Sequence, residues 1–240
     1  MDFSLTREQE LIRKMIAAFT KNEVEPIAAE IDRTHEYPAA NIEKMFQLGI
    51  MGMTVPAEYG GAGADQISAA ICTEELAKAC ASTSDIVAGH TLCCVPILEH
   101  GTEEQKKKYL PEVLSGKKMG SFCLTEPDAG SDAAGCKTTA IWNGKEYILN
   151  GLKCFITNGP LADYYMVVAL TNPELKTKGL TAFIVEREWE GVSIGKIEDK
   201  CGIRCAQVSE VIFDNVRVPK ENMLGEEGKG FAVAMKDLDG

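Results

Sequence analysis

FCLTEPDAGSD (residues 122–132) and KCFITNG (residues 153–159) decide how the fold of this chain is interpreted. Each begins as a short apolar run, which is typical of a strand, and continues with residues that typically terminate a strand. In the first, Pro127 biases the residue before it away from helix, and Gly130 permits a left-handed or tight backbone. This predicts a strand ending in a loop rich in hydroxyls and backbone N–H groups, which suits a large phosphate-bearing ligand. The second predicts a strand running into an Asn-Gly-Pro turn, so the two strand ends could frame a planar ring.

Composition places the chain among ordinary globular proteins. Its 240 residues, 45% hydrophobic and 25% charged, can hold one large domain or two small ones. A net charge of −11 argues against nucleic-acid binding, which needs basic patches. There is no run of 18 apolar residues, and the acidic N-terminus does not resemble a signal peptide. We therefore expect a cytoplasmic protein with no membrane partner.

Nine scattered cysteines form no Cys-x-x-Cys pair. Most lie in apolar surroundings, where a free cysteine behaves as a small hydrophobic residue. Zinc binding through His90-x-x-Cys93-Cys94 and redox chemistry through Cys201-x-x-x-Cys205 are the alternatives, but the spacing of a structural zinc site is absent. We expect a reducing compartment and no metal.

The first half of the chain has the apolar period of helices. Thr6 and Gln9 have the spacing of a capping box, and Thr102 and Gln105 repeat it. An apolar stripe at helical period follows the first box, formed by Leu11, Ile12, Met15, Ile16 and Phe19. Further helices are expected over residues 23–33, 40–48, 67–79 and 83–100, with Pro26 near a first turn, and the second capping box precedes residues 106–110, after which residues 111–114 close the region.

After Gly116 the period becomes that of strands. Short β-branched or aromatic runs are separated by turn residues, among which Asn143-Gly144 is a strong hairpin signal and Asn150-Gly151 indicates a second turn. The expected strands are residues 119–124, 137–142, 147–149, 154–157, 164–170, 181–185 and 208–218. Pro219 ends them, and the pattern turns helical again from Phe231.

These patterns predict an α+β protein in three parts. An all-helical bundle (residues 1–116) is followed by an antiparallel, β-barrel-like domain (residues 117–222) and by the first turns of a C-terminal helical domain (residues 223–240). A helix that runs almost to the last residue is an unusual end for a domain, so we expect most of the third domain to lie outside this sequence.

Familiar catalytic motifs are absent. No G-x-G-x-x-G follows an expected strand, and there is no P-loop or G-x-S-x-G elbow. Glu126 and Asp128 could form an acid/base pair of the glycosidase kind, but turn-forming and hydrogen-bonding roles are favoured. Nothing in composition or spacing alone indicates a flavin site.

The two opening stretches together closely resemble the acyl-CoA dehydrogenase family, flavoenzymes whose middle domain carries a TEPxAGSD loop and a W/F-I-T-N strand end. The resemblance runs the length of the chain. It includes MDFSLTREQ (residues 1–9), PAEYGG (residues 56–61), GTEEQK (residues 101–106) and NMLGEEGKGF (residues 222–231).

This resemblance implies FAD bound outside any Rossmann fold. The main chain and hydroxyl at Leu124 and Thr125 would contact the pyrimidine side of the flavin, and Thr157 would donate a hydrogen bond near N5. The positions implied for FAD are Phe122, Leu124, Thr125, Gly130, Ser131, Phe155, Ile156 and Thr157. The positions implied for acyl-CoA are Ser131 and Asp239.

The implied reaction is α,β-dehydrogenation of an acyl-CoA thioester, with electrons passed to an electron-transferring flavoprotein. The resemblance further implies an enzyme of fatty acid metabolism that is a homotetramer when full length. The family's glutamate base lies far into the C-terminal domain. No residue of this sequence is therefore assigned as catalytic, and we expect these 240 residues alone to be inactive. Phe155 in place of the common Trp, and Asp128 in place of a common Gly, resemble short-chain (butyryl-CoA) members.

Three alternatives stay open. An enoyl-CoA reductase and an acyl-CoA oxidase of the same family would have the same motifs. A non-catalytic flavin- or acyl-CoA-binding fragment would apply if the natural chain ended at Gly240.

Overall fold

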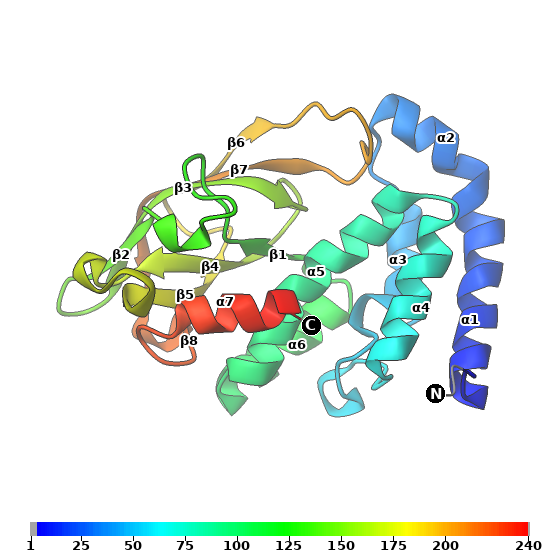
Figure 1. Cartoon of the computed structure of the whole chain (residues 1–240), viewed down its shortest axis with the longest axis horizontal. Helices are drawn as coiled ribbons and strands as arrows, with labels where there is room; N and C mark the ends of the chain where they lie inside the picture. The colour runs from blue at the N-terminus through cyan, green and yellow to red at the C-terminus, as the bar shows by residue number, and fades with distance from the viewer. Residues whose placement is uncertain (1–3, 240) are drawn as a thin grey trace. The chain divides into compact units, whose positions relative to one another are not determined.

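The computed structural model describes residues 4–239 (Figure 1). Residues 1–3, part of the opening quoted above, and Gly240 lie outside this range. The helices are α1 (Arg7–Phe19), α2 (Glu25–Thr34), α3 (Ala39–Gln47), α4 (Gln66–Ala77), α5 (Ala81–His100), α6 (Glu103–Leu114) and α7 (Gly230–Asp239). The strands are β1 (Gly120–Cys123), β2 (Thr139–Trp142), β3 (Tyr147–Thr157), β4 (Tyr164–Leu170), β5 (Leu180–Glu186), β6 (Val192–Ile197), β7 (Val208–Val218) and β8 (Met223–Leu224).

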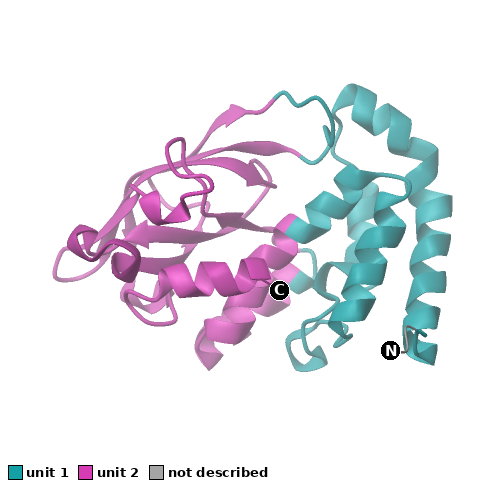
Figure 2. Ribbon diagram, in the orientation of Figure 1, with its two compact units in different colours: residues 1–88, 114–116, 199–206 teal, residues 89–113, 117–198, 207–240 magenta. Residues whose placement is uncertain are grey.

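Internal contacts divide the chain into two compact units (Figure 2). Unit 1 consists of residues 1–88, 114–116 and 199–206, and unit 2 of residues 89–113, 117–198 and 207–240. Neither unit is one continuous stretch, because α5 belongs to both and the β6–β7 connection belongs to unit 1. The domain limits at residues 116 and 222 stay a prediction of the sequence.

Unit 1 is helical, and its first helix begins as the sequence predicts. The Thr6 N–H donates to Gln9 Oε1 (2.9 Å) and the Gln9 N–H donates to Thr6 Oγ1 (3.2 Å), which completes the capping box. Gln9 Nε2 also donates to Asp65 Oδ2 (2.7 Å), and Asp65 caps α4 through the Ser68 N–H (2.8 Å). The starts of α1 and α4 are therefore tied together.

The apolar stripe of α1 is only partly a core face. Ile16 and Phe19 are buried, but Leu11 is 58% exposed and Met15 is 38% exposed. A single turn of π-helix (Thr20–Val24) then joins α1 to α2, and Pro26 lies in the first turn of α2 as expected.

Unit 2 holds one mixed sheet. Within residues 4–239, eight strands form it in the order β6-β7-β3-β2-β4-β5-β8, with β1 paired to β4. The α+β class is confirmed. The antiparallel prediction is wrong for β1–β4 and β2–β4, which are parallel, and the sheet does not close into a barrel. Alternating apolar residues mark a strand but carry no information about the direction of its partner.

The Asn143-Gly144 hairpin is confirmed, because it joins β2 to β3 with Trp142 opposite Tyr147. The turn predicted at Asn150-Gly151 is wrong, since β3 runs straight through it with a shift in its register against β7. A Cβ on Gly151 would lie 2.3 Å from Thr138 Oγ1, so this glycine allows a close approach within a bulge.

Strands β4 and β5 form the centre of the core. Residues 164–169 and 180–185 are all buried, as expected for strands covered on both faces. Helix α7 packs against β4 and β5 (Figure 1). The weaker strands β6 and β8 were not predicted, because β6 contains Gly195 and Lys196 and β8 has only two residues. Helix α5 is long and apolar enough to cross a membrane by composition alone, a test that core helices of soluble proteins also pass.

Candidate functional site

The two stretches quoted at the outset lie side by side in unit 2. The Cys154 N–H donates to the Thr125 carbonyl (2.9 Å), and Ser121 Oγ donates to the Thr157 carbonyl (2.5 Å). The end of β1 therefore lies beside the end of β3. Because both strands end at this point, their hydroxyl-bearing terminal residues lie close together.

Phe155 is the most unusual residue at these strand ends. Its φ is +56°, in the left-handed region, which costs an ordinary residue roughly 1–2 kcal/mol. Its side chain is nevertheless 64% exposed, so burial does not offset that cost. The register of β3 against β7 shifts between Lys153 and Ile156, which turns the ring of Phe155 outward. Strained backbone of this kind clusters at active sites and ligand-binding sites, which makes Phe155 a candidate for ligand contact.

The turn after Thr157 is fixed from within. Asn158 is fully buried at φ +62°, and its N–H donates to the Gln207 carbonyl (2.9 Å). Gly89 of α5 lies against the same turn, since a Cβ on Gly89 would be 2.8 Å from Thr157 Cγ2. The helix therefore supports the strand end because residue 89 has no side chain. Sequence reasoning missed Gly89, whose contact lies 68 positions away.

The loop after β1 is anchored by a buried ion pair that the sequence analysis did not predict. Lys153 Nζ lies 2.7 Å from Glu126 Oε1, and the two side chains are 0% and 4% exposed. Lys153 Nζ also donates to the Leu124 carbonyl (3.0 Å). Glu126 accepts the N–H groups of Lys137 (2.6 Å) and Thr138 (3.0 Å). The two ends of the loop are thereby tied to each other and to the middle of β3.

These contacts decide the ionisation of Glu126. Burial alone would raise the pKa of its carboxyl, but the Lys153 charge and the hydrogen bonds outweigh burial and lower the pKa to about 2. Glu126 is therefore a permanent carboxylate at neutral pH. Asp128 is 68% exposed and pairs with Lys137 (2.6 Å). The two carboxyl groups shape the loop, as the sequence analysis favoured.

The outer part of the loop is open. Gly130 and Ser131 are exposed, and a Cβ on Gly130 would meet no atom within 4 Å. Of the two conformations that Gly130 permits, the left-handed one is not adopted, because its φ is not positive, but the backbone does bend at this residue. The turn is made by Glu126 and Ala129, which exchange two backbone hydrogen bonds (3.0 and 3.1 Å).

The nine positions predicted to contact FAD or acyl-CoA differ in accessibility. Leu124 (8%) and Ile156 (2%) are buried, which leaves their main chain as the reachable part. Phe122, Thr125 and Thr157 are half-buried. Asp239 is exposed on α7, and among the described residues no hydrogen bond or ion pair joins it to the two strand ends. Their roles in binding stay a prediction.

His90 and its neighbouring cysteines serve the fold of unit 2. His90 Nδ1 accepts the Gly120 N–H (3.1 Å) at the start of β1, and its Nε2 lies 3.5 Å from Cys94 Sγ. Burial lowers the pKa of His90 to about 4, so the ring is neutral. Within residues 4–239, no group of three or more His, Cys, Asp or Glu side chains is placed to hold a metal ion.

Comparison with known proteins agrees with this architecture. Residues 6–117 match the family model for the acyl-CoA dehydrogenase N-terminal domain, and residues 121–216 match the model for its middle domain. The chain belongs to the acyl-CoA dehydrogenase family. The unit that carries the two strand ends contains nearly all of the matched middle domain.

Individual relatives are similar over the whole chain. The chain is 52% identical to the short-chain specific acyl-CoA dehydrogenase of Clostridium acetobutylicum and 47% identical to the acryloyl-CoA reductase (NADH) of Anaerotignum propionicum. It spans 100% of its own length in both matches, but only 64% and 61% of the relatives' lengths. A solved acyl-CoA dehydrogenase from Bacillus anthracis, complexed with FAD, superposes with a TM-score of 0.90 at 38% identity, covering 98% of this chain and 40% of that one.

Proposed function

We propose that this chain is the N-terminal part of an FAD-dependent acyl-CoA dehydrogenase acting on short-chain thioesters. The observation that carries the proposal is the meeting of two strand ends around an exposed aromatic ring, Phe155, in the chain of a family member. We further propose that the enzyme is cytoplasmic, homotetrameric when complete, and passes its electrons to an electron-transferring flavoprotein.

The residues at the strand ends fit a flavin. Phe155 offers an exposed ring against which a planar isoalloxazine can pack, and contact with such a ligand would offset the energetic cost of the strained backbone at this residue. Thr125 and Thr157 are half-buried hydroxyls on adjacent strand ends, suited to hydrogen bonds at the edge of the same ring. Ser131, exposed on the loop, suits a phosphate or the CoA moiety.

FAD, when bound, supplies the acceptor for the two electrons removed from the substrate. The chain's own residues position that acceptor. The ion pair between Glu126 and Lys153, and the hydrogen bond from the Cys154 N–H to the Thr125 carbonyl, fix the main chain that carries the Thr125 hydroxyl. Hydrogen bonds from such hydroxyls favour a reduced, anionic flavin.

The Thr157 hydroxyl tests the proposal in the complete enzyme. Thr157→Val keeps the β-branched shape and removes one neutral donor, worth about 0.5–1.5 kcal/mol. That shifts a two-electron flavin potential by roughly 10–30 mV. The matched control is Thr139→Val, a half-buried threonine in β2 of the same sheet, which should leave the potential unchanged. Equal potentials and equal butyryl-CoA turnover in all three proteins would remove Thr157 from the site.

The direction of the reaction needs its own assay, since a relative at 47% identity is named a reductase. The complete enzyme should oxidise butyryl-CoA with an artificial electron acceptor. Faster reduction of a short enoyl-CoA by a reduced donor, with no measurable oxidation, would favour the reductase instead.

We also expect residues 1–240, purified alone, to bind FAD poorly and to lack dehydrogenase activity. The proposed base and the second wall of the flavin site would come from a C-terminal domain, and each 1.4 kcal/mol of lost contact is about tenfold in affinity. Visible absorption of bound flavin and a butyryl-CoA assay check this. A yellow, active 240-residue protein would show that a base within these residues has been missed.

A further inference from the structure

Three Asn-Gly dipeptides follow one another in unit 2, at residues 143–144, 150–151 and 158–159. An asparagine before glycine is prone to lose ammonia, because the glycine nitrogen can attack the side-chain amide with no side chain of its own in the way. The attack requires the backbone to bring that nitrogen against the amide carbon. The structure holds the three dipeptides in three different ways, so their reactivities should differ.

The first dipeptide lies in the open connection between β2 and β3. Asn143, Gly144 and Lys145 are all exposed, and a Cβ on Gly144 would meet no atom within 4 Å. Water can therefore reach the Asn143 amide, and ammonia can leave it.

The side chain of Asn143 is folded over the residue that follows it. Asn143 Oδ1 accepts the N–H groups of Lys145 (2.9 Å) and Glu146 (3.0 Å). Both donors come after Gly144 in the chain, so the amide carbon is brought to the side of the Gly144 nitrogen, as in an Asx turn. When that nitrogen attacks, Oδ1 gains negative charge. The two donors would stabilise this charge as backbone N–H groups do in an oxyanion hole.

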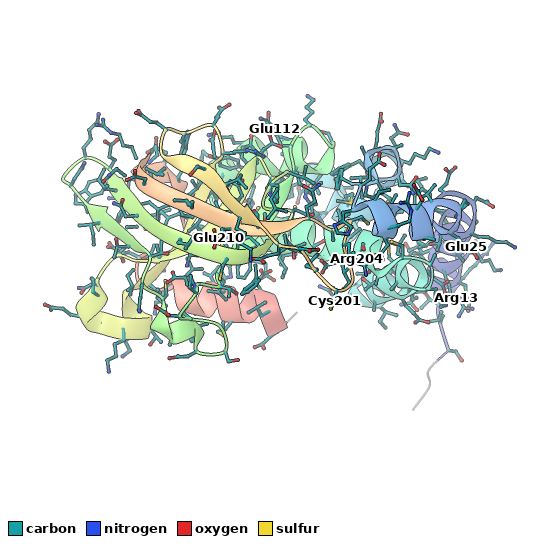
Figure 3. The ribbon with its side chains drawn as sticks, turned by 90° about the horizontal axis from the view of Figure 1, so that it is seen from above. Arg13, Glu25, Glu112, Cys201, Arg204 and Glu210 are labelled. Atoms are coloured by element: carbon teal, nitrogen blue, oxygen red, sulfur yellow. The ribbon has the colours of Figure 1, made fainter. Side chains whose placement is uncertain are left out.

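The second dipeptide is held inside the sheet. Strand β3 pairs with β2 on one edge and with β7 on the other, and Figure 3 shows β3 alongside β7, the strand that carries the labelled Glu210. Asn150 Oδ1 accepts the Asn215 N–H of β7 (2.8 Å), so the side chain is drawn to the neighbouring strand and not along its own. The extended backbone keeps the Gly151 nitrogen away from the Asn150 amide until this part of the sheet opens.

The third dipeptide is buried in the turn after β3. Asn158 is 0% exposed, and Gly159 is buried beside it. The Gly159 N–H donates to the Ile156 carbonyl (3.0 Å), so the nitrogen that would attack already makes a hydrogen bond. A Cβ on Gly159 would lie 2.6 Å from Ser209 Oγ, which shows how closely β7 packs against this turn. The Asn158 amide is therefore kept from water while the turn is folded.

We propose that Asn143 is a site of spontaneous modification to aspartate and isoaspartate, and that the fold protects Asn150 and Asn158 from the same reaction. The Gly144 nitrogen forms a bond to Asn143 Cγ, the bond from Cγ to Nδ2 breaks, and ammonia leaves with the proton of the Gly144 N–H. Water then opens the cyclic imide. Attack at Cγ gives aspartate, and attack at the main-chain carbonyl carbon gives isoaspartate. In sum one water is consumed and one ammonia is released.

Both products alter the connection between β2 and β3. Each adds a carboxylate near Glu146, which already pairs with Arg217 (3.7 Å). Isoaspartate also lengthens the main chain by one methylene between Trp142 and Tyr147, which face each other where the two strands join. This modification involves neither the flavin nor the proposed dehydrogenase activity, so its test can succeed or fail on its own.

The test incubates the purified protein in neutral buffer for several days and follows its tryptic peptides by mass spectrometry. Trypsin separates the three dipeptides into residues 138–145, 146–153 and 154–176. We expect the first peptide to gain the mass difference between OH and NH2 at least about tenfold faster than the other two, since each 1.4 kcal/mol of local opening slows a reaction about tenfold. In protein unfolded by guanidinium chloride, the three rates should become similar. A sample digested without incubation corrects for conversion during digestion.

A second readout tests attack by the Gly144 nitrogen. The cyclic imide opens to both products, whereas direct hydrolysis of the amide gives aspartate alone. A protease that cleaves before aspartate cuts only the aspartate product, and Asn143→Asp supplies the reference peptide for it. Three results would each overturn the proposal: no conversion of Asn143 in the folded protein, conversion of Asn150 or Asn158 at the same rate, or aspartate without isoaspartate.

Discussion

Replacing Lys153 by methionine should be one of the most damaging single changes in unit 2. Methionine fills a similar volume but carries no charge, so Glu126 would remain buried opposite an apolar group. The Leu124 carbonyl would lose its donor as well. The carboxylate would keep only its two backbone N–H partners and the Cys136 thiol (3.0 Å).

Removing one partner of a buried ion pair costs about 3–5 kcal/mol. The pKa of Glu126 is lowered from 4.5 to about 2 by the Lys153 charge and the hydrogen bonds together, against burial, and at about 1.36 kcal/mol per pKa unit this net shift corresponds to roughly 3 kcal/mol of stabilisation from all of these contacts. Because the folded pKa is depressed, this stabilisation is complete above about pH 4.5 and is lost as the pH falls toward 2. We therefore expect a loss of about 3 kcal/mol in the free energy of unfolding at pH 7.

Urea unfolding followed by tryptophan fluorescence measures this loss. The chain has two tryptophans, Trp142 and Trp189, and both belong to unit 2. The matched control is Lys137→Met, which breaks an ion pair of the same loop whose two side chains are 70% and 68% exposed. Exposed pairs contribute little, so the control should unfold like the unmodified protein.

The reasoning would be refuted if Lys153→Met were no less stable at pH 7 than Lys137→Met. A second readout is the pH dependence between pH 5 and pH 2.5. The unmodified chain should lose the Glu126 contribution over this range, and Lys153→Met should not.

Further predictions concern close packing and a buried carboxyl. Gly89→Ala should destabilise the chain by up to about 2 kcal/mol net, because a clash of about 1–3 kcal/mol opposes the roughly 1 kcal/mol that alanine gains in a helix. Gly130→Ala, facing open space, should not destabilise, and a stabilising Gly89→Ala in urea unfolding would contradict the packing. Burial raises the pKa of Asp237 to about 8, so the folded chain holds a proton between about pH 4 and pH 8 that the unfolded chain releases, and stability falls as the pH rises through that range. Asp237→Asn should abolish this fall in stability, which is worth up to about 5 kcal/mol at pH 8. Asp239→Asn, a change at an exposed residue of the same helix, should leave the fall in stability unchanged. Identical pH profiles of stability for the two variants would count against a buried acid at Asp237.

Local patterns predicted the elements of this fold better than their pairing. The capping boxes at Thr6 and Thr102 and the Asn143-Gly144 hairpin depend on neighbours a few residues apart, and each is present. The same dipeptide at Asn150-Gly151 misled, because its role in a bulge depends on the contact with Thr138, which only the folded sheet provides. The parallel pairing of β1 with β4 likewise has no local signal.

For the candidate site, the sequence indicated the residues that end the strands but not those that hold them. The break in an apolar run indicated a strand end at Phe155 and Thr157, and the resemblance to the acyl-CoA dehydrogenase family assigned these two residues to the flavin. Lys153 offered one available signal, a lysine at a position where β3 is otherwise apolar, but its partner Glu126 lies 27 positions away. Gly89 gave no such signal, because a glycine within a helix has no single interpretation until its neighbour is known.

The order of pairing in the sheet has a consequence for how the protein is made. Strand β3 ends at Thr157, and β7, which covers its second edge, begins only at Val208. At about 5–20 residues per second, a ribosome needs roughly 3–10 s to synthesise the intervening segment. During that time the β2–β3 hairpin can form, but the outer edge of β3 has unpaired N–H and C=O groups along eleven residues. Each nascent chain therefore passes through an interval in which this edge is open to chaperones and to other nascent chains.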